Sequence, residues 1–344
     1  MRASVIVVDW HQPELTRRCV AALMKQQTAS GFDVVVVENE VAPGAAPDFS
    51  DLGAVTVVEV RENSGFAGGV DRGIRESDAP VVVLVNNDAV VEPGFLQAGI
   101  QALQGAGGDV AAVAGAVILE GQFVPAVDRD SDTLVGLDGR LWRRVRDGET
   151  GRALLNGTGV ELTRDGNGFD RDWLAPVEGD LASHDLSRPD PFGFSGGAVF
   201  IRRGALEAVG GFDPALFMYY EDVDVAWRLR LAGYRIALAA DAVVVHRHAA
   251  SSSSNGTLVR SQSMTNRLAV VVRNGSPSMI ARVAARTALR LVADFVRPRN
   301  AYIDRPSWGR VLGRLPGLVR HSLSARRRDG VASSRRREVE RLLL

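Results

Sequence analysis

Short apolar runs alternate with amphipathic stretches over the first hundred residues. Continuous runs of β-branched and aliphatic residues predict strands at 4–8, 33–37, 55–60 and 81–85. Between them, apolar residues spaced as on one helical face predict helices at 14–26, 66–76 and 94–103. This alternation is typical of the α/β class, with a doubly wound, mostly parallel and Rossmann-like sheet.

Regular patterning weakens over residues 121–191, which are rich in Asp, Arg and Gly. We expect a long excursion over the sheet edge with short strands. Patterning returns with strands at 197–202, 235–238 and 242–246 and helices at 203–209 and 221–232. A serine linker at 251–254 precedes helices at 264–273 and 278–296, and residues 326–344 are expected to fray.

Composition favours a globular protein of the cytoplasm. Of 344 residues, 46% are hydrophobic and 24% charged, and Cys19 is the single cysteine. An intrachain disulfide is therefore impossible, which favours a reducing compartment, and Cys19 reads as a buried structural thiol on a helix. The N-terminus lacks a signal segment, and no apolar run approaches the ~18 residues of a spanning helix.

Charge divides the chain into two parts. Residues 256–344 contain 19 Arg and no Lys against five acidic residues, a net charge of +14, so residues 1–255 carry −14. We expect a domain over 1–255, with a nucleotide half at about 1–120 and an acceptor half at about 121–255, and a basic helical extension over 256–344. Such a tail suits an anionic partner: a membrane surface, polyphosphate or nucleic acid. The extension could instead pack on the domain.

The strand at 81–85 stops abruptly on Asn86, Asn87 and Asp88. In an open α/β sheet, ligands bind beyond the carboxyl ends of the strands. A carboxylate there can hold Mg²⁺ or Mn²⁺ together with substrate phosphates. A plain strand-end turn is the competing interpretation, because Asn and Asp are common turn residues.

A glycine-rich segment lies just before the helix at 66–76. It reads Asn63-Ser64-Gly65-Phe66-Ala67-Gly68-Gly69. Glycines let backbone amides approach a ligand, and a helix N-terminus favours anions. The segment lacks the Lys-Ser/Thr ending of a P-loop. At the end of the second strand, Glu38 could accept hydrogen bonds from a ribose or a base edge, and Glu40 could share that role.

Three further features point to a polar site. Gly196 and Gly197 lie at the start of a strand, and the absence of side chains there would leave room for a ligand close to the backbone. Glu221 and Asp222 begin a helix after two tyrosines, where an ionised carboxylate is a competent general base, although acidic residues also cap helices. His246 ends an apolar strand and is a candidate metal ligand. Arg202 and Arg203, which follow the glycines, suit phosphate binding less well than a structural role.

Five motifs in this order resemble family-two glycosyltransferases with a GT-A fold, over roughly residues 1–275. The bacterial branch with rhamnosyltransferases and galactofuranosyltransferases of cell-surface polysaccharide assembly is the most similar. The motifs are Asn63-Ser64-Gly65-Phe66-Ala67-Gly68-Gly69, Asn86-Asn87-Asp88, Gly210-Gly211-Phe212-Asp213, Tyr220-Glu221-Asp222-Val223-Asp224 and His246. Actinobacterial members are also similar at Asn156-Gly157-Thr158-Gly159, Asp165-Gly166 and Asn266-Arg267-Leu268.

The resemblance implies an inverting sugar transfer from a nucleoside-diphosphate sugar, dTDP- or UDP-linked, to a glycan or lipid-linked acceptor. Rhamnose-like deoxysugars are the favoured donors. Asp88 would bind the metal that bridges the diphosphate, His246 would contact metal or diphosphate, and Asp222 would be the base beside Glu221. Glu38 would read the nucleoside and the segment from Asp9 to His11 would face the base. Asn86 departs from the carboxylate of the family's metal motif, and Val70-Asp71 replaces a common Asn-Asn.

Two other functions compete with a transferase. A sugar-nucleotide nucleotidyltransferase would carry a glycine-rich loop with Arg and Lys after the first strand, where this chain has Asp9-Trp10-His11-Gln12-Pro13. A degenerate, non-catalytic module is supported by Asn86 and opposed by Asp88, Asp222 and His246. No nucleic-acid partner is expected, and localisation is expected to be cytoplasmic, with peripheral attachment at the inner face of the plasma membrane if the tail binds lipid.

Overall fold

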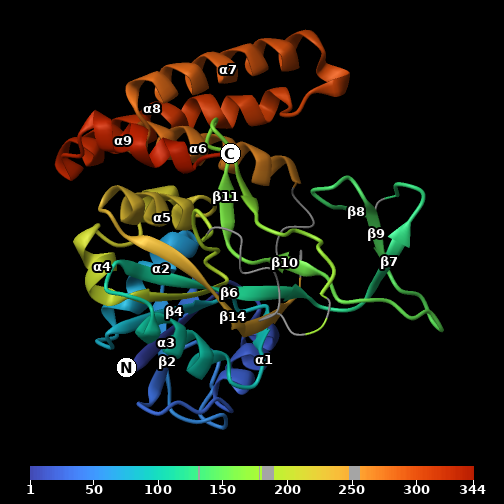
Figure 1. Ribbon diagram of the computed structural model, residues 1–344, viewed down its shortest axis with the longest axis vertical. Helices are drawn as coiled ribbons and strands as arrows, with labels where there is room; N and C mark the ends of the chain where they lie inside the picture. The colour runs from blue at the N-terminus through green and yellow to red at the C-terminus, as the bar shows by residue number, and fades with distance from the viewer. Residues whose placement is uncertain (131, 178, 180–189, 248–255) are drawn as a thin grey trace.

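A nine-stranded mixed sheet forms the centre of the molecule (Figure 1). The computed structural model describes residues 1–130, 132–177, 179, 190–247 and 256–344. The strand order is β3-β2-β1-β4-β13-β6-β14-β5, and β10 pairs with β6. The strands are β1 (Ala3–Asp9), β2 (Phe32–Asn39), β3 (Val55–Val60), β4 (Val81–Val85), β5 (Ala89–Val91), β6 (Val110–Leu119), β10 (Leu155–Gly157), β13 (Ala198–Arg202) and β14 (Arg235–His246).

Four strands at the N-terminal side of the sheet are parallel. β1 pairs with β2 and β4, and β2 pairs with β3, all in the same direction. β14 is parallel to β6, whereas β13 runs antiparallel between β4 and β6, and β5 runs antiparallel to β14. The carboxyl ends of β1, β2 and β4 therefore lie at one edge, which is where a ligand site is expected in such a sheet.

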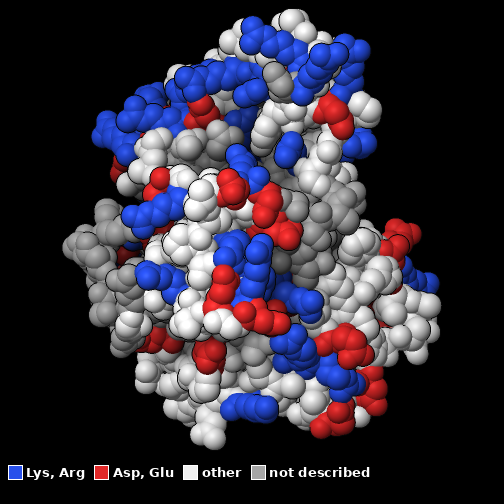
Figure 2. Space-filling model, turned by 90° about the vertical axis from the view of Figure 1, so that its right-hand side faces the viewer, with Lys and Arg blue, Asp and Glu red and all other residues white. Residues whose placement is uncertain are grey.

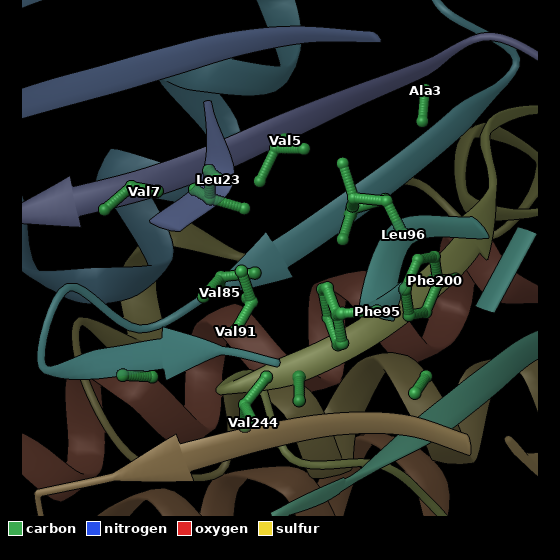
Figure 3. Packing of buried hydrophobic residues seen from close by; sticks show 14 of the residues in the cluster. Ala3, Val5, Val7, Leu23, Val85, Val91, Phe95, Leu96, Phe200 and Val244 are labelled. Atoms are coloured by element: carbon green, nitrogen blue, oxygen red, sulfur yellow. The ribbon is translucent and has the colours of Figure 1, made fainter. Parts of the chain in front are cut away.

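Helices cover both faces of the sheet. Val5 and Val7 point to one face and pack with Phe95 and Phe200 (Figure 3), whereas Ile6 points to the other. Both faces are buried, so the strands are apolar throughout instead of alternating with polar residues. The first face carries α1 (Pro13–Leu23) and α3 (Phe95–Gly105), and the second carries α2 (Gly65–Arg75), α4 (Arg203–Ala208) and α5 (Glu221–Leu231). This arrangement confirms the doubly wound α/β class.

The excursion after β6 forms two small sheets, one at the side of the molecule and the other beneath the C-terminal helices (Figure 1). One has a core of its own around Phe123, Trp142 and Leu174, and the other is a hairpin. The strands are β7 (Phe123–Ala126), β8 (Leu134–Val135) and β9 (Leu141–Arg144) in the first, and β11 (Val160–Leu162) and β12 (Gly168–Asp170) in the second.

Helices from the C-terminal part pack against α5. Trp227 of α5 is fully buried beneath Leu268 to Val271 of the first of these helices, together with Met279, Leu318 and Leu343. Basic side chains gather over this part at the top of Figure 2. The elements are α6 (Gly256–Asn274), α7 (Pro277–Val296), η3 (Pro298–Asn300), α8 (Arg305–Asp329), α9 (Ser333–Val339) and η4 (Glu340–Leu342).

Several elements differ from the sequence-based expectation. Residues 326–344 do not fray, because Val339 and Leu343 are buried and the Leu344 amide donates to the Leu162 carbonyl at 2.9 Å. The strands expected at 235–238 and 242–246 are one strand, β14, with an irregular register between Ala239 and Val243. β5, β6 and α8 were not anticipated, and the serine linker at 251–254 lies outside the described residues.

Cys19 is buried, as expected, with its Sγ 3.5 Å from the carbonyl oxygen of Asn86. Within the ranges described above, no helix combines the length and apolar character that crossing a membrane requires.

Candidate active site

Polar side chains of neighbouring strand ends hold one another at the carboxyl edge of the sheet. Asp9 ends β1, and its Oδ1 accepts hydrogen bonds from Thr16 Oγ1 at 2.5 Å and Asn87 Nδ2 at 2.7 Å. Asn87 follows β4, so these contacts join two strand ends. The turn that carries Asp88 is thereby fixed against β1.

Glu38 lies beside Asp9, because the two residues are paired in the register of β1 and β2. Glu38 is buried, and this burial, together with the charge and hydrogen bonding of Asp9, raises its pKa to about 8. Two adjacent carboxylates in a poorly solvated place cannot both ionise at low cost. At neutral pH the Glu38 carboxyl is therefore protonated and can donate as well as accept a hydrogen bond.

The raised pKa of Glu38 predicts that stability falls as pH rises. The pKa of Glu38 is about 8 in the folded protein and about 4.5 in the unfolded chain. Between these two pH values the folded protein binds more protons than the unfolded chain, so the free energy of unfolding falls as pH rises through about 8. We expect Glu38→Gln to reduce the fall in Tm between pH 6 and pH 9 by a few degrees, since 1 kcal/mol corresponds to about 2–4 °C. Thermal unfolding measured against pH checks this, with the exposed Glu62→Gln as control; identical slopes for both variants would contradict it.

The glycine-rich segment is held by protein groups. Asn39 Oδ1 accepts from both the amide and the hydroxyl of Ser64 at 2.9 Å, and Asn63 Oδ1 accepts from the Gly65 amide at 2.9 Å. The Ala67 amide donates to the Phe217 carbonyl at 2.9 Å. Three of the amides that were expected to face an anion at this helix start are thus engaged within the protein.

The glycines of this segment allow close packing. Gly65 has φ +69°, and a Cβ there would lie 2.2 Å from the Phe217 carbonyl oxygen. A Cβ on Gly69 would lie 2.6 Å from Val8 Cγ1, and one on Gly68 would lie 2.6 Å from Ser64 Cβ. Gly69 therefore lets α2 pack tightly on β1, and Gly65 lets it approach the loop that precedes α5, whereas the tight contact at Gly68 is with the start of α2 itself.

Asp88 and His246 meet at the end of β4 and β14. The Nε2 atom of His246 lies 3.0 Å from Asp88 Oδ1, with the side chains 18% and 7% exposed. The Nδ1 atom of His246 lies 2.9 Å from Asn156 Oδ1. The structure thus brings the two predicted metal ligands together.

Asn156 and Asp170 are site residues whose contacts sequence reasoning missed. Asn156 Nδ2 donates to Asp170 Oδ2 at 3.2 Å. Asp170 is half-buried, and the desolvation of its carboxyl, together with the charge of Asp222, raises its pKa to about 6. Asn156 belonged to a motif noted for its resemblance, but nothing in the pattern around Asp170 marks it.

Asp222 stands at the start of α5, where two backbone amides orient its carboxylate. Its Oδ1 accepts from the Val223 amide at 2.7 Å and its Oδ2 from the Gly196 amide at 3.2 Å. Desolvation raises the pKa of Asp222 despite these hydrogen bonds. Glu221 is buried, and its desolvation and the charge of Asp222 raise its pKa well above the usual range. Glu221 therefore stays neutral more readily than Asp222.

Asp224, the third carboxylate of the cluster, has a structural role. Burial alone would raise its pKa, but Arg228 and Arg273 lower it below the ordinary value. Its Oδ2 lies 2.7 Å from Arg228 Nη2 and 3.2 Å from Arg273 Nη1, and its Oδ1 accepts from Asn274 Nδ2 at 2.8 Å. The Arg228 pair lies within α5, whereas the contacts from Arg273 and Asn274 join α5 to α6.

Asn266 holds the strained loop that leads into α5. The loop follows η2 (Pro214–Leu216), and Phe217, Tyr219 and Tyr220 all have φ between 65° and 72°. Asn266 Nδ2 donates to the carbonyls of Leu216, Met218 and Tyr219 at 2.7, 2.9 and 2.7 Å. A residue of α6 thus fixes the backbone just before the predicted base.

Asn86 and Gly197 are neighbours. The Asn86 amide donates to the Gly197 carbonyl at 3.3 Å, and a Cβ on Gly197 would lie 3.1 Å from Asn86 Nδ2. Phe66 of α2 lies next to Gly196, whose Cβ would be 2.9 Å from the ring. The glycine pair therefore leaves room for two site side chains.

Arg202 and Arg203 are structural. They lie at the far end of β13, where Arg202 is paired with Val81, the first residue of β4. Arg202 Nε donates to the Val110 carbonyl at 2.8 Å, and Arg203 Nε donates to the Ala79 carbonyl at 2.7 Å. This agrees with the structural role that the sequence favoured over phosphate binding, because both side chains are engaged away from the carboxyl edge.

The donors at Asp88 and His246 suit a divalent cation. A carboxylate oxygen and an imidazole nitrogen 3.0 Å apart are both acceptable ligands of Mn²⁺, and Mg²⁺ takes one or two carboxylates with substrate phosphates. In the described part of the chain, no three His, Cys, Asp or Glu side chains gather as a complete metal cage. A cation held here would need oxygens from a bound ligand as well.

Comparison with known proteins identifies the family. The model of "Glycosyl transferase family 2" matches residues 4–175, half of the chain. Two curated relatives from Mycobacterium tuberculosis, of strains CDC 1551 and H37Rv, are named N-acetylglucosaminyl-diphospho-decaprenol L-rhamnosyltransferase. Each is 45% identical over 58 residues. That match spans 17% of this chain and 19% of the relative.

Solved structures share the fold at low identity. GalNAc-T7 with UDP, GalNAc and Mn²⁺ has a TM-score of 0.56 at 12% identity, covering 81% of this chain and 49% of that one. The mannosyltransferase PcManGT of Pyrobaculum calidifontis, with GDP-Man and Mn²⁺, has a TM-score of 0.51 at 18% identity, covering 97% and 86%. Residues 1–349 of TarS from S. aureus give 0.50 at 15% identity, covering 99% and 90%. With its family match and this sheet, the chain belongs to glycosyl transferase family 2 and has the GT-A fold.

Proposed function

We propose that this protein transfers a sugar, with inversion, from a nucleoside-diphosphate sugar to a hydroxyl group of a glycan or lipid-linked acceptor. The observation that carries the proposal is the carboxylate of Asp222, which two backbone amides orient. Asp170 interacts electrostatically with both Asp222 and His246, and His246 contacts Asp88, so these groups belong to one site. Its raised pKa makes Asp222 a stronger base than an ordinary aspartate.

One displacement accounts for the reaction. Asp222 accepts the proton of the acceptor hydroxyl, and the hydroxyl oxygen forms a bond to the anomeric carbon. The bond from that carbon to the diphosphate oxygen breaks, and the nucleoside diphosphate leaves with the electron pair. Burial and the charge of Asp222 raise the pKa of Glu221 well above its usual range, which favours its neutral form and leaves Asp222 as the proton acceptor.

Asp88 and His246 are the residues that would hold Mg²⁺ or Mn²⁺. When bound there, the cation would neutralise the charge of the leaving diphosphate. Support comes from the donor pair itself and from two neighbours of the same fold that were crystallised with Mn²⁺ and nucleotide ligands.

The nucleoside would lie against Asp9 and Glu38, with Asn63, Gly65, Phe66, Gly68, Gly69, Asn86, Asn87 and Gly197 shaping the rest of the donor site. A dTDP- or UDP-linked sugar is the proposed donor class, and a rhamnose-like deoxysugar is favoured. The support for rhamnose is the short match to the mycobacterial rhamnosyltransferases. Release of nucleoside diphosphate from a panel of dTDP-, UDP- and GDP-sugars tests this choice; turnover of GDP-sugars alone would overturn it.

Replacing Asp88 tests the donor site. We expect Asp88→Ala to weaken UDP or dTDP binding at least about tenfold in Mn²⁺ while leaving binding in EDTA unchanged, because one metal ligand is lost. Calorimetric titration of both nucleotides measures this. Asp71→Ala, which removes a carboxylate paired with Arg75 on α2, is the control. Equal binding by wild-type protein with Mn²⁺ and with EDTA would rule out a metal-bridged donor.

We further propose that α7 contacts an anionic membrane, where a lipid-linked acceptor would be found. Its outer face carries Leu289, Val292 and Val296, which are 70%, 59% and 70% exposed. Arg286 and Arg290 flank this apolar stripe and are 64% and 50% exposed. An apolar face bordered by cations is suited to the headgroup region of an anionic bilayer. Val283, on the opposite face, is buried in the extension, so one face of α7 packs while the other stays available.

Liposome sedimentation of the full chain tests the membrane contact. We expect the protein to pellet with phosphatidylserine-containing vesicles at low salt and to be released as salt rises, because the arginine contribution is screened. Leu289→Glu with Val292→Glu should weaken pelleting severalfold, whereas Val127→Glu, which alters a 94% exposed valine of the excursion, should not. A full-length protein that ignores these vesicles at low salt would disprove the contact.

A further inference from the structure

We propose that Asn156 and Asp170 are positioning residues that fix the tautomer of His246 and leave its Nε2 lone pair facing Asp88, ready for a divalent cation. The proposal rests on the proposed function, in which Asp88 and His246 hold that cation. It assigns a task to the excursion after β6, which brings both positioning residues to the site.

The sheet explains why Asn156 reaches His246. β6 pairs with β10 through Leu155 and Ile118, and with β14 through Leu119 and His246. The excursion therefore returns to β6, the strand that also pairs with β14, and it does so next to the end of β14 where His246 lies. Asp170 ends β12, and the hairpin of β11 and β12 places it on the other side of Asn156.

Asp170 sets the orientation of the Asn156 amide. An ionised carboxylate can only accept hydrogen bonds, so the end of the amide that faces it must be the NH₂ group. Asn156 Nδ2 lies 3.2 Å from Asp170 Oδ2, which leaves Asn156 Oδ1 directed at His246 Nδ1 at 2.9 Å.

The oriented amide then selects the imidazole tautomer. Asn156 Oδ1 is an acceptor, so His246 Nδ1 must carry a hydrogen. In the neutral imidazole the lone pair is then on Nε2, which lies 3.0 Å from Asp88 Oδ1. Two acceptors at this distance repel unless a metal ion lies between them or a proton on Nε2 turns the contact into an ion pair. Carboxylates and amides behind a histidine commonly tune a metal site in this way.

Two variants of the full chain separate this role from a general structural one. Asn156→Leu removes the acceptor for Nδ1 and keeps the branching of the side chain at Cγ. Thr158→Val is the matched control: it removes the 2.5 Å hydrogen bond from Thr158 to Asp172 in the same excursion, away from His246. Asp170→Asn keeps the side-chain shape but lets either end of the new amide face Asn156, so it should loosen the orientation without leaving a cavity.

The readouts are the His246 tautomer and the binding of Mn²⁺. Long-range ¹H–¹⁵N spectra of histidine-labelled protein, assigned with His246→Gln, report which ring nitrogen carries the hydrogen. We expect the Nδ1–H form in wild type and in Thr158→Val, and loss of that preference in Asn156→Leu with a mixture in Asp170→Asn. Mn²⁺ affinity, measured by electron paramagnetic resonance with UDP present, should fall about 10–100-fold in Asn156→Leu.

The results distinguish this inference from the proposed function. A wild-type His246 in the Nε2–H form, or wild-type Mn²⁺ affinity in Asn156→Leu, would overturn the positioning role even if sugar transfer is demonstrated. The opposite outcome is also informative. If the wild-type protein transfers no sugar from any donor, the proposed reaction is refuted. The positioning role would still be supported if wild-type His246 is in the Nδ1–H form and Asn156→Leu loses both that form and Mn²⁺ affinity.

Discussion

Asp222→Asn is expected to lower the rate of sugar transfer by about 10²–10⁴, the usual cost of losing a general base, with nucleotide affinity near the wild-type value. An amide cannot accept the acceptor's proton at neutral pH. Its single carbonyl oxygen can still accept from one of the two backbone amides that orient Asp222, those of Gly196 and Val223, so the start of α5 should stay folded. Initial rates of nucleoside diphosphate release, with calorimetric binding of the nucleotide, measure the two effects separately.

Glu221→Gln is the matched control, because Glu221 is the adjacent carboxyl on the same helix. Burial and the charge of Asp222 raise its pKa well above the usual range, which favours the neutral acid, so an amide should replace it at little cost in rate. The opposite pattern, with Asp222→Asn active and Glu221→Gln inactive, would show that the base has been assigned to the wrong carboxylate.

The strands that the sequence predicts well are continuous apolar runs with polar residues on both sides. The predicted strand at 81–85 is β4 and the predicted strand at 55–60 is β3, because a β-branched run between polar residues has few alternatives. The convergence of Asp9, Glu38 and Asp88 also follows from pattern, since parallel strands end at a common edge. The fold class and the Asp88–His246 pair are therefore predictable from the order of apolar runs and the polar residues that end them.

Other features depend on contacts that no local pattern contains. β6 contains four alanines and a glycine, residues with weak strand preference, so its sequence does not stand out as a strand. It nevertheless pairs with β10, β13 and β14. The link from Asn156 to Asp170 joins residues 14 apart through the turn between two short strands. The glycine-rich segment has the composition of an anion cradle, but its amides meet Asn39, Asn63 and Phe217, partners that only the folded chain brings near.

The C-terminal extension is the hardest part to interpret from sequence, because arginine is usually a surface residue. Arg273 is instead buried, between Asp224 of α5 and Asp329 of α8. Arg336 is also buried, and desolvation lowers its pKa to about 10. Arg273 is paired with carboxylates, whereas Arg336 donates hydrogen bonds to the backbone carbonyls of Val331 and Arg273. Both buried guanidinium groups therefore have the partners that a buried ion requires. The charge of +14 therefore describes a mixture of surface and interior groups.

Removing residues 256–344 is expected to abolish folding of the remaining chain. The deletion exposes Trp227, which is fully buried in the whole chain. It also removes Asn266, which holds the loop before α5, and Arg273, which pairs with the carboxylate of Asp224. Burying an aromatic of this size contributes about 2–3 kcal/mol, and an uncompensated Asp224 would cost more. Circular dichroism and thermal unfolding of the 1–255 fragment should show an aggregated product or no cooperative transition.

Arg273→Ala in the full chain separates loss of the ion pair from loss of the whole interface. We expect it to cost about 2 kcal/mol, less than the ~3–5 kcal/mol typical of breaking a buried pair, because Arg228 and Asn274 still contact Asp224. Arg337→Ala, an exposed arginine of α9, should change stability by less than about 0.5 kcal/mol. A monomeric 1–255 fragment that unfolds cooperatively and binds UDP would show that α6 to α9 are dispensable for the site. If it folds but no longer pellets with anionic vesicles, the extension would serve the membrane alone, and the packing of α6 on α5 would contribute little to stability.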